Sequence, residues 1–352
     1  MSLVGELTLE RAYYHCRHCR RGHCPRDGRL GLGAGDLTPG AEQAAALAAA
    51  LGSFAEAAGK TLPRLAGLRL AESTVERAAE RAGRRVGERL AAGQTFGPAK
   101  DWDWQPDADG RTCAYVAADL TGVGMQGPGA VAAEGRMAAV AMIYNPGVAG
   151  QARYLAGLAG GLEALGEPLR RQGAQVGMDR ADRWVAISDG GAGIEEFLRV
   201  YFPRAEAVIL DFYHAAEHLN DWAKAQHPED PSAAAGLAGP WCHRLKHEGG
   251  AAVLEALQAL DVGRRPAARE AHRQLLGYFA NQAHRMDYPA YRARGWQIGS
   301  GPVESACKQV VGQRMKGGGM RWGEPGADAV CHLRALFRSE ASQWDAFWAN
   351  AA

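Results

Sequence analysis

The chain has 352 residues, of which 47% are hydrophobic and 22% are charged, and its formal net charge is +1. These values are typical of a folded protein of about two domains, and they exclude a disordered chain and a generally polycationic one. No apolar stretch approaches the roughly 20 residues of a membrane-spanning helix, and the N-terminus lacks the pattern of a signal peptide. We therefore expect a cytoplasmic protein, with its seven cysteines reduced or bound to metal rather than paired as disulfides.

A basic segment rich in Cys and His lies within residues 1–35 and reads "HCRHCRRGHC". Its Cys-x-x-Cys pair is one knuckle of a zinc ribbon, but a ribbon needs a second pair, which the sequence does not contain. We therefore expect a partial, zinc-ribbon-like segment, which either binds Zn²⁺ locally or binds no metal. The candidate ligands are Cys16, Cys19 and Cys24, with His15 and His23 as further candidates.

Residues 36–94 have Ala and Leu at helical spacing and form a predicted helical region. Ser73 and Glu76 have the spacing of a capping box, which predicts a helix that begins at Thr74. A short turn precedes this helix and arginines follow, among them Arg77 and Arg81. This pattern is typical both of a DNA-binding helix-turn-helix and of an ordinary helical hairpin.

A polar segment at 95–111 is the predicted domain boundary, and beyond it strands and helices alternate. This order predicts an α/β layer whose last strands are parallel. The strands are expected at 112–119, 135–145, 183–189 and 205–211, with the first two as a hairpin, and the helices at 154–173 and 193–203.

The remaining part of the chain is predicted to be largely helical. Residues 212–290 are helical with an interruption at 227–241. Residues 296–352 then contain a loop, a helix from about Val303, a glycine-rich turn at 317–319 and a last helix that ends near Trp348.

Acidic residues stand where predicted strands and helices meet. Asp119, Asp189 and Asp211 each end a predicted strand, and Glu304 lies at the start of a helix. Ligands of α/β sheets bind at the carboxyl ends of strands, and an ionised carboxylate there needs a partner such as a divalent cation. Taken singly, each acid is also consistent with a turn, a cap or a helix-dipole role.

Two aspartates and a glutamate together would form an oxygen-rich, partly open site that suits Mg²⁺ or Mn²⁺. Ions held in this way can activate water or a 3′-hydroxyl and stabilise the leaving oxygen of a phosphoryl transfer. Basic residues follow Glu304 and are predicted to hold a nucleic-acid backbone beside the metals. They are Lys308, Arg314, Lys316 and Arg321.

The tail "GSGPVESACKQVVGQRMKGGGMRW", together with "ISDGG", "DFYHAAEH" and "RAYYHCRHC", resembles the ISKra-type insertion-sequence transposases. These are DDE (Asp-Asp-Glu) enzymes of the Mutator-like group, with an RNase H-like core in which helices flank a mixed sheet. The resemblance implies Mg²⁺-dependent cleavage and joining of DNA at transposon ends, with Asp119, Asp189 and Glu304 as the triad. It also implies a homodimer or higher oligomer on DNA, in association with the nucleoid.

The same resemblance divides the C-terminal part of the chain into three. Residues 112–215 would be the first part of the catalytic core, 216–295 a helical insertion, and 296–352 the segment that completes the core. Within "DFYH", Asp211 and His214 match an accessory Asp-x-x-His motif. Asp211 is therefore the alternative second acid, and His214 would hydrogen-bond substrate phosphate or orient Asp211. The alternative is a structural role for both residues.

Two features leave other functions open. Leu120 stands where the family's first motif has glycine, and the family's upstream Cys pair is missing, which indicates a truncated gene or a mis-called start; both favour a truncated or domesticated DNA-binding protein without catalysis. The loop between the first two strands also lacks the basic residues that the resemblance implies. Separately, "HAAEH" matches the inverted zincin motif with Glu217 as the base, which is the pattern of a zinc peptidase.

Overall fold

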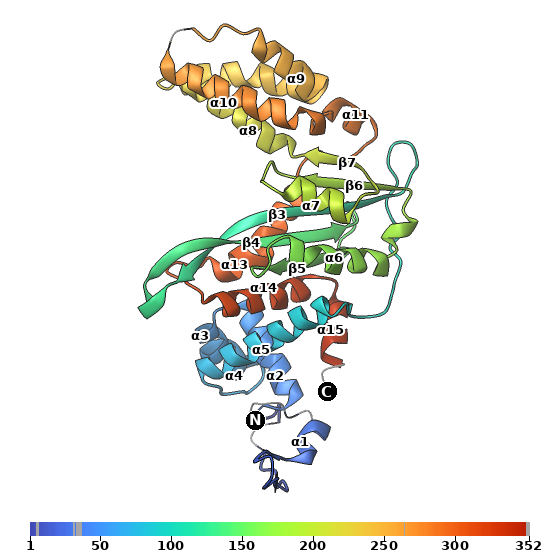
Figure 1. Cartoon of the computed structure of the whole chain (residues 1–352), viewed down its shortest axis with the longest axis vertical. Coiled ribbons are helices and arrows are strands. Elements are labelled where there is room, and N and C mark those ends of the chain that lie inside the picture. The colour runs from blue at the N-terminus through green and yellow to red at the C-terminus, as the bar shows by residue number, and fades with distance from the viewer. Residues whose placement is uncertain (5–6, 31, 33–36, 264, 350–352) are drawn as a thin grey trace.

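The computed structural model describes residues 1–4, 7–30, 32, 37–263 and 265–349 of the chain. A five-stranded mixed sheet lies in the middle of an elongated molecule (Figure 1). One group of helices lies at one end of the molecule, and the N-terminal helices lie at the other. The mixed sheet with its flanking helices is compatible with an RNase H-like α/β fold.

The strand order of the sheet is β5-β4-β3-β6-β7. Neighbours among β5, β4 and β3 are antiparallel, whereas β6 is parallel to β3 and β7 is parallel to β6. The central strand β3 begins as an almost wholly apolar run that is buried on both faces, as expected for a strand covered on both sides. The strands are β3 (Cys113–Gln126), β4 (Ala132–Tyr144), β5 (Ala152–Gly157), β6 (Arg183–Ser188) and β7 (Ala205–Leu210).

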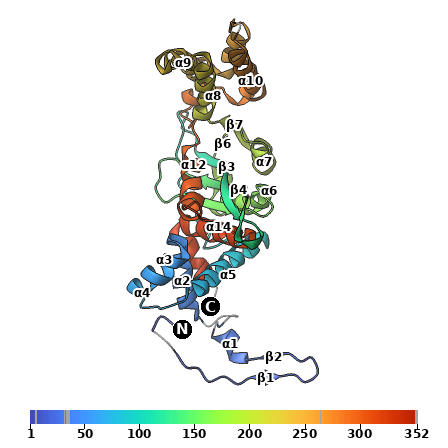
Figure 2. The same ribbon diagram turned by 90° about the vertical axis from the view of Figure 1, so that its left-hand side faces the viewer.

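Alternate residues of β3 enter two different hydrophobic cores, because successive side chains of a strand point to opposite faces. Ala114, Val116 and Ala118 pack on the side of α6 (Glu163–Gln175) and α7 (Ile194–Tyr201). Tyr115 and Ala117 pack on the other side, with α12 (Gly301–Ala306) and the first helix of the insertion. Figure 2 shows α6 and α7 on one side of the sheet and α12 on the other.

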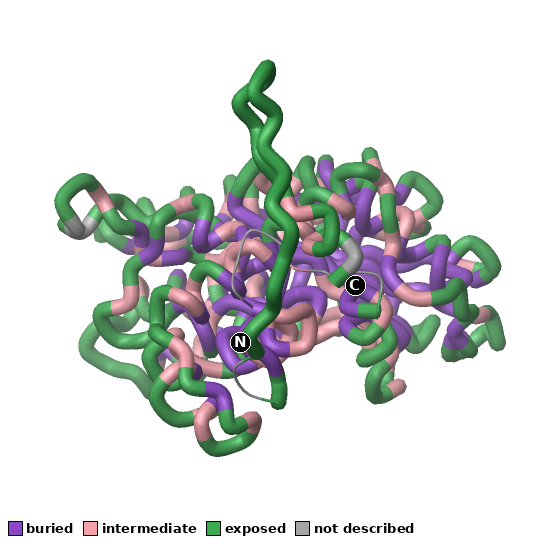
Figure 3. Tube along the Cα trace, turned by 90° about the horizontal axis from the view of Figure 1, so that it is seen from below, coloured by how far each residue is buried: buried purple, intermediate pink, exposed green. Residues whose placement is uncertain are grey.

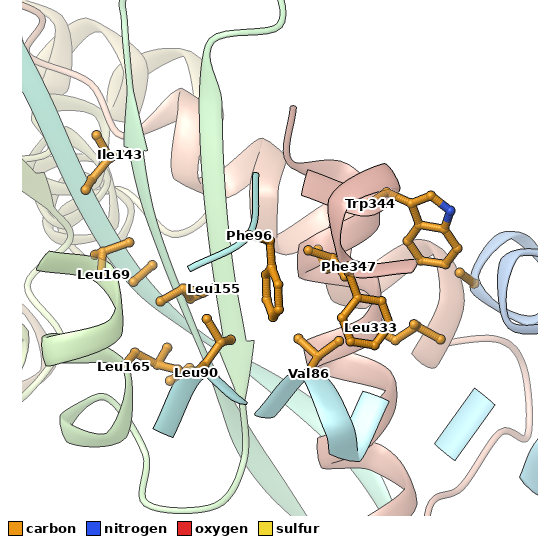
Figure 4. Packing of buried hydrophobic residues seen from close by; sticks show 14 of the residues in the cluster. Val86, Leu90, Phe96, Ile143, Leu155, Leu165, Leu169, Leu333, Trp344 and Phe347 are labelled. Atoms are coloured by element: carbon orange, nitrogen blue, oxygen red, sulfur yellow. The ribbon is translucent and has the colours of Figure 1, made fainter. Parts of the chain in front are cut away.

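The N-terminal helices share the first of these cores instead of forming a separate one. Val86 and Leu90 pack with Phe96, Leu155 and Leu333 (Figure 4). The helices of this region and their C-terminal partners are α2 (Pro39–Leu51), α3 (Phe54–Glu56), η1 (Ala57–Thr61), α4 (Leu62–Leu65), α5 (Glu72–Ala91), α14 (Glu324–Arg338) and α15 (Ala341–Ala349). The segment 95–111 contains no helix or strand, as predicted, yet it buries Trp102 and Trp104.

The helical insertion occupies the end of the molecule beyond β7 (Figure 1). It confirms the helices predicted for 212–290, but the interruption covers only 227–230 because α9 begins at Pro231. Its helices are α8 (Phe212–Gln226), α9 (Pro231–Gln258), α10 (Pro266–Gln282), η4 (Ala283–Arg285) and α11 (Tyr288–Ala293).

Four predicted boundaries were wrong. The helix predicted at 154–173 is the strand β5 followed by α6, because residues 152–157 pair with β4. The strand predicted to end at Asp119 continues to Gln126, since β4 accompanies it beyond the end of β6. The last helix is divided into α14 and α15 at residues 339–340.

The fourth wrong boundary is the capping box. Helix α5 begins at Glu72 with Ala71 as its N-cap, so Ser73 lies inside the helix. The capping box of this region is at α3, where Ser53 and Glu56 bond each other's backbone reciprocally.

The N-terminal segment is an exposed arm that stands off from the rest of the chain (Figure 3). It contains β1 (Tyr14–His15), β2 (Gly22–His23) and α1 (Pro25–Arg29). The boundary predicted between residues 35 and 36 lies outside the described residues. The remaining short elements are η2 (Pro128–Ala130), η3 (Met178–Arg180), η5 (Cys307–Gly312) and α13 (Gln313–Met315). Every helix in the described part of the chain is too short or too polar to cross a membrane.

Candidate active site

Asp119 and Asp189 lie side by side where β6 ends. The last pair between the two strands joins Ala118 to Ser188, so Asp119 is the next residue of β3 and Asp189 the first residue beyond β6. β6 is the fourth strand of the five-stranded sheet along the chain. Both acids therefore lie at the edge of the sheet where α/β proteins bind ligands.

The Asp119 carboxylate is half-buried and is held by two neighbours. Its Oδ1 accepts a hydrogen bond from the Leu120 N–H at 2.6 Å, and the Cys307 thiol donates to Oδ2 at 3.4 Å. Burial raises the pKa of Asp119, and the negative charges of Asp189 and Glu304 raise this pKa further. Asp189 and Glu304 are thus close enough to Asp119 to raise its pKa.

Asp189 is positioned by its own loop and by an arginine of the insertion. Its Oδ1 accepts the Gly191 N–H at 3.0 Å. The guanidinium of Arg285, which is 1% exposed, donates to the Ser188 hydroxyl at 2.6 Å and to the Val208 carbonyl at 3.1 Å. Arg285 thereby fixes β6 and β7 near the points from which Asp189 and Asp211 emerge.

A single hydroxyl joins Asp211 to Glu304. Ser300 Oγ lies 2.6 Å from Asp211 Oδ2 and 2.8 Å from Glu304 Oε1. A hydroxyl has one proton to donate, so one of the two carboxyl groups must itself carry a proton if both contacts are hydrogen bonds. Asp211 is the better candidate, because its burial raises its pKa. Its Oδ1 also accepts the Tyr213 N–H, which makes Asp211 the N-cap of α8.

The donor set of these four acids fits Mg²⁺ or Mn²⁺. No Lys, Arg or His side chain among the described residues lies within 4.0 Å of any of the four carboxylates to balance their charge, and two of the four have raised pKa values. Burial is the first cause of both raised pKa values and neighbouring carboxylates add to them, and a bound cation would offset both effects. In the described part of the chain, however, no three His, Cys, Asp or Glu side chains are gathered closely enough to form a metal site.

The basic residues after Glu304 differ in their surroundings. Lys308 is exposed one turn beyond Glu304, and Lys316 Nζ donates to Thr121 Oγ1 at 2.6 Å, two residues beyond Asp119. Arg321 is exposed as well. Arg314 is buried, donates to the Ala49 carbonyl at 2.8 Å, and lies between two aromatic rings, so in this structure it cannot contact DNA phosphate.

The two arginines of α5 that are predicted to contact DNA differ in their exposure to solvent. Arg77 is exposed, whereas Arg81 pairs with Glu42 of α2 at 3.2 Å and is only half-exposed. Helix α5 packs along α2 and α14, and a helix-turn-helix is not established by this arrangement. These contacts are consistent with an ordinary helical hairpin, which is the other interpretation of the sequence.

Three ring side chains of the helical insertion contact one another: His214, His218 and Tyr278. His214 and His218 lie on one face of α8 with their ring centroids 5.1 Å apart, and His218 stacks on Tyr278 of α10 at 3.7 Å. Glu217 is exposed and lies 3.7 Å from His214. The spacing of the zinc-peptidase motif is present, but no third ligand completes a zinc site among the residues described.

The N-terminal cysteines adopt one feature of a zinc knuckle. The Cys19 N–H donates to Cys16 Sγ at 3.5 Å, and this bond is the first cause of a lowered pKa of the Cys16 thiol. Cys16 and Cys19 are exposed and Cys24 is half-buried. A zinc ribbon is not shown, because the described residues hold no group of three potential ligands here either.

Four site residues were missed by sequence reasoning: Ser300, Cys307, Arg285 and Tyr278. Ser300 lies four residues before Glu304, and Cys307 three residues after it, so their helical spacing from Glu304 was an available signal. Arg285 and Tyr278 come from the insertion, where nothing in the sequence connects them to the acids.

No protein-family model matches the chain, and a search of curated proteins finds no significant match.

Proposed function

We propose that the chain is a DDE transposase, which cleaves DNA at transposon ends and joins it to a target with Mg²⁺ or Mn²⁺ held by Asp119, Asp189 and Glu304. The observation that carries this proposal is that Asp119, inside β3, lies beside Asp189, and that the charges of Asp189 and Glu304 both raise its pKa, while the described part of the chain has no ion pair to any of the three. Carboxylates so placed are typical ligands of hard cations.

Bound metal would activate the attacking water or 3′-hydroxyl and stabilise the leaving oxygen. Groups of the protein would orient the acids and attract the DNA. The Leu120 N–H and the Cys307 thiol orient Asp119, and Ser300 orients Glu304. Lys308 and Lys316 are the best-placed groups to attract the DNA backbone, since one is exposed beyond Glu304 and the other is anchored near Asp119.

Asp189 is preferred to Asp211 as the second acid because it adjoins Asp119 and adds to the rise in its pKa. Asp211 is engaged by Ser300 and by the start of α8, which suits an accessory residue that positions Glu304. We also propose that DNA is bound by a homodimer or higher oligomer, in association with the nucleoid.

Cleavage of DNA that carries the element's ends tests the proposal. In Mg²⁺ the parent should cut, and Asp119→Asn, Asp189→Asn and Glu304→Gln should each lose more than about 100-fold in rate, since even outer-shell partners of metal ligands contribute roughly 10–100-fold. Asp221→Asn is the matched control, because Asp221 is an exposed α8 residue paired with Lys224. Triad variants that cut at the parent's rate would refute the assignment.

Two assays test the alternative functions, a DNA-binding protein without catalysis and a zinc peptidase. A parent protein that binds DNA but does not cut it in Mg²⁺ or Mn²⁺ would be a DNA-binding protein without catalysis. Peptide hydrolysis that requires zinc and is lost in Glu217→Gln would instead identify a peptidase.

A further inference from the structure

Four basic side chains gather on the surface of the helical insertion and form what we call the α9–α11 basic patch: His243, Lys246, His247 and Arg292. The first three lie on α9, and Arg292 lies on α11. The rings of His243 and His247 stack with their centroids 4.3 Å apart, and Arg292 Nη1 lies 3.5 Å from His247 Nδ1. Both histidines and Arg292 are exposed, and Lys246 is half-buried. The patch is therefore open to a ligand from solvent.

The charge of the α9–α11 basic patch is not balanced by acids. Among the described residues no carboxylate pairs with its four side chains, whereas Arg244, on the same helix, pairs with Glu248 at 2.7 Å. Desolvation lowers the pKa of His247, and the proximity of the other three members lowers it further. A guanidinium can only donate, so Nδ1 of the uncharged His247 ring accepts from Arg292 and Nε2 carries the proton. The patch thus offers permanent charges and N–H donors, which an anion with several oxygens would satisfy.

The α9–α11 basic patch belongs to the side of the molecule that carries Glu304. Figure 2 shows α9 and α12 on one side, whereas α10 and α7 lie on the other. Lys246 Nζ lies 5.8 Å from the centre of the Phe212 ring, and Phe212 directly follows Asp211. The next residue, Tyr213, is 66% exposed, so the start of α8 is accessible to a large ligand. A ligand at the acids could therefore extend along α8 to the patch.

We propose that the α9–α11 basic patch binds the phosphate backbone of the DNA duplex that extends from the acids. Lys246 and Arg292 each neutralise a phosphate, and the imidazoles donate hydrogen bonds to phosphate oxygens. This inference rests on the proposed function and assigns to the insertion a contact with the DNA that flanks the reacting phosphate. Carboxylates repel phosphate, so cationic side chains outside the group of acids are needed to hold the flanking backbone. Contacts to the backbone carry no sequence information, so the patch supplies affinity and not specificity.

The double variant Lys246→Gln/Arg292→Gln removes the two permanent charges of the patch. Its matched control is Arg265→Gln/Arg269→Gln, because these exposed arginines lie at the start of α10, on the other side of the insertion (Figure 2). A third variant, Lys246→Arg/Arg292→Lys, keeps both charges. The affinity of each protein for a fluorescein-labelled DNA duplex of mixed sequence is measured in Ca²⁺ by fluorescence anisotropy over a series of NaCl concentrations. The midpoint of thermal unfolding without DNA is recorded for each variant, and cleavage by the parent is followed separately in Mg²⁺.

For the parent, the logarithm of the DNA affinity should fall linearly with the logarithm of the salt concentration, because binding releases counterions from the DNA. This slope should be shallower by about 2 in Lys246→Gln/Arg292→Gln, since each phosphate contact contributes about 0.9. At about 0.1 M salt the affinity of this variant should be lower by at least about tenfold. The control and the charge-conserving variant should keep the parent's slope. All variants should unfold close to the parent's temperature, because the substituted side chains form no ion pairs within the described residues.

Equal slopes for Lys246→Gln/Arg292→Gln and the parent would overturn the backbone contact and leave the proposed function in place. An equal loss of slope in the α10 control would also overturn it, because the effect would then follow net charge and not the patch. A parent that binds DNA without cutting it would refute catalysis, and the slopes would still decide the role of the patch. A parent that does not bind DNA at all would overturn both proposals.

Discussion

The carboxylate of Asp119 is destabilising for the folded protein as long as no cation accompanies it. Its pKa is raised by burial and by the neighbouring acids, so the folded state binds a proton more tightly than the unfolded state does. The protonated carboxyl of Asp119 makes its full contribution to stability below the pKa of the unfolded state. This contribution is lost as the pH rises through the pKa of the folded state.

We therefore expect Asp119→Asn to raise the unfolding midpoint of the metal-free protein at pH 7.5, by about 1–2 °C per kcal/mol gained, since the unfolding entropy grows with chain length. The increase should vanish below about pH 3.5, where the unfolded carboxyl is protonated as well. Thermal unfolding in EDTA across this pH range measures it. Addition of Mg²⁺ should stabilise the parent and not the variant. A variant less stable than the parent at pH 7.5 would show that Asp119 already has a stabilising partner.

At the scale of elements, the contact between α5 and α14 depends on a glycine. A Cβ atom on Gly83 would come within 1.9 Å of the Ala329 carbonyl oxygen. Since this oxygen belongs to the backbone, the two helices would have to separate. This contact joins the N-terminal helices to α14, which packs on β5.

Gly83→Ala should therefore lower the free energy of unfolding, by about 1–3 kcal/mol as for other overpacked sites. Gly236→Ala is the matched control, because Gly236 lies inside α9 with open space around it, and alanine there should stabilise the protein by about 0.5–1 kcal/mol. Urea unfolding of both variants provides the comparison. If Gly83→Ala were as stable as the parent, the close approach of the helices would be wrong.

The elements themselves were predictable where local pattern and tertiary pairing agree. β6, α7 and β7 lie within a few residues of their predicted positions, since β6 and β7 are short, largely apolar runs and α7 is an amphipathic segment between Gly193 and Pro203. β5 was mistaken for helix because its short sequence "ARYLAG" suits either structure, and only its pairing with β4 decides. The prediction of a capping box at Ser73 was wrong, because helix α5 begins one residue earlier, at Glu72.

At the scale of the whole molecule, the candidate site is assembled from segments far apart in the sequence. Asp119 comes from the middle of β3 and Asp189 from the end of the neighbouring strand β6, and Glu304 follows the helical insertion in the sequence. The sequence predicted these acids from their places at element ends. It could not predict that Arg285 and Tyr278 of the insertion would approach them, because those contacts depend on how the insertion packs on the sheet.

Binding of Mn²⁺ to the protein without DNA, followed by the loss of the electron paramagnetic resonance signal of free Mn²⁺, tests the central claim most directly. The parent should bind Mn²⁺, and Asp119→Asn and Asp189→Asn should weaken that binding by more than about tenfold, since each removes a ligand. Asp211→Asn should weaken it less.

The Cys16→Ser/Cys19→Ser variant serves as the control, because it removes the N-terminal thiols and leaves the carboxylates intact. It should bind Mn²⁺ as the parent does. The account predicts a Mn²⁺ site that is lost with Asp119 or Asp189 and kept without the cysteines. Equal Mn²⁺ binding by the parent and by the Asp119→Asn and Asp189→Asn variants would contradict it.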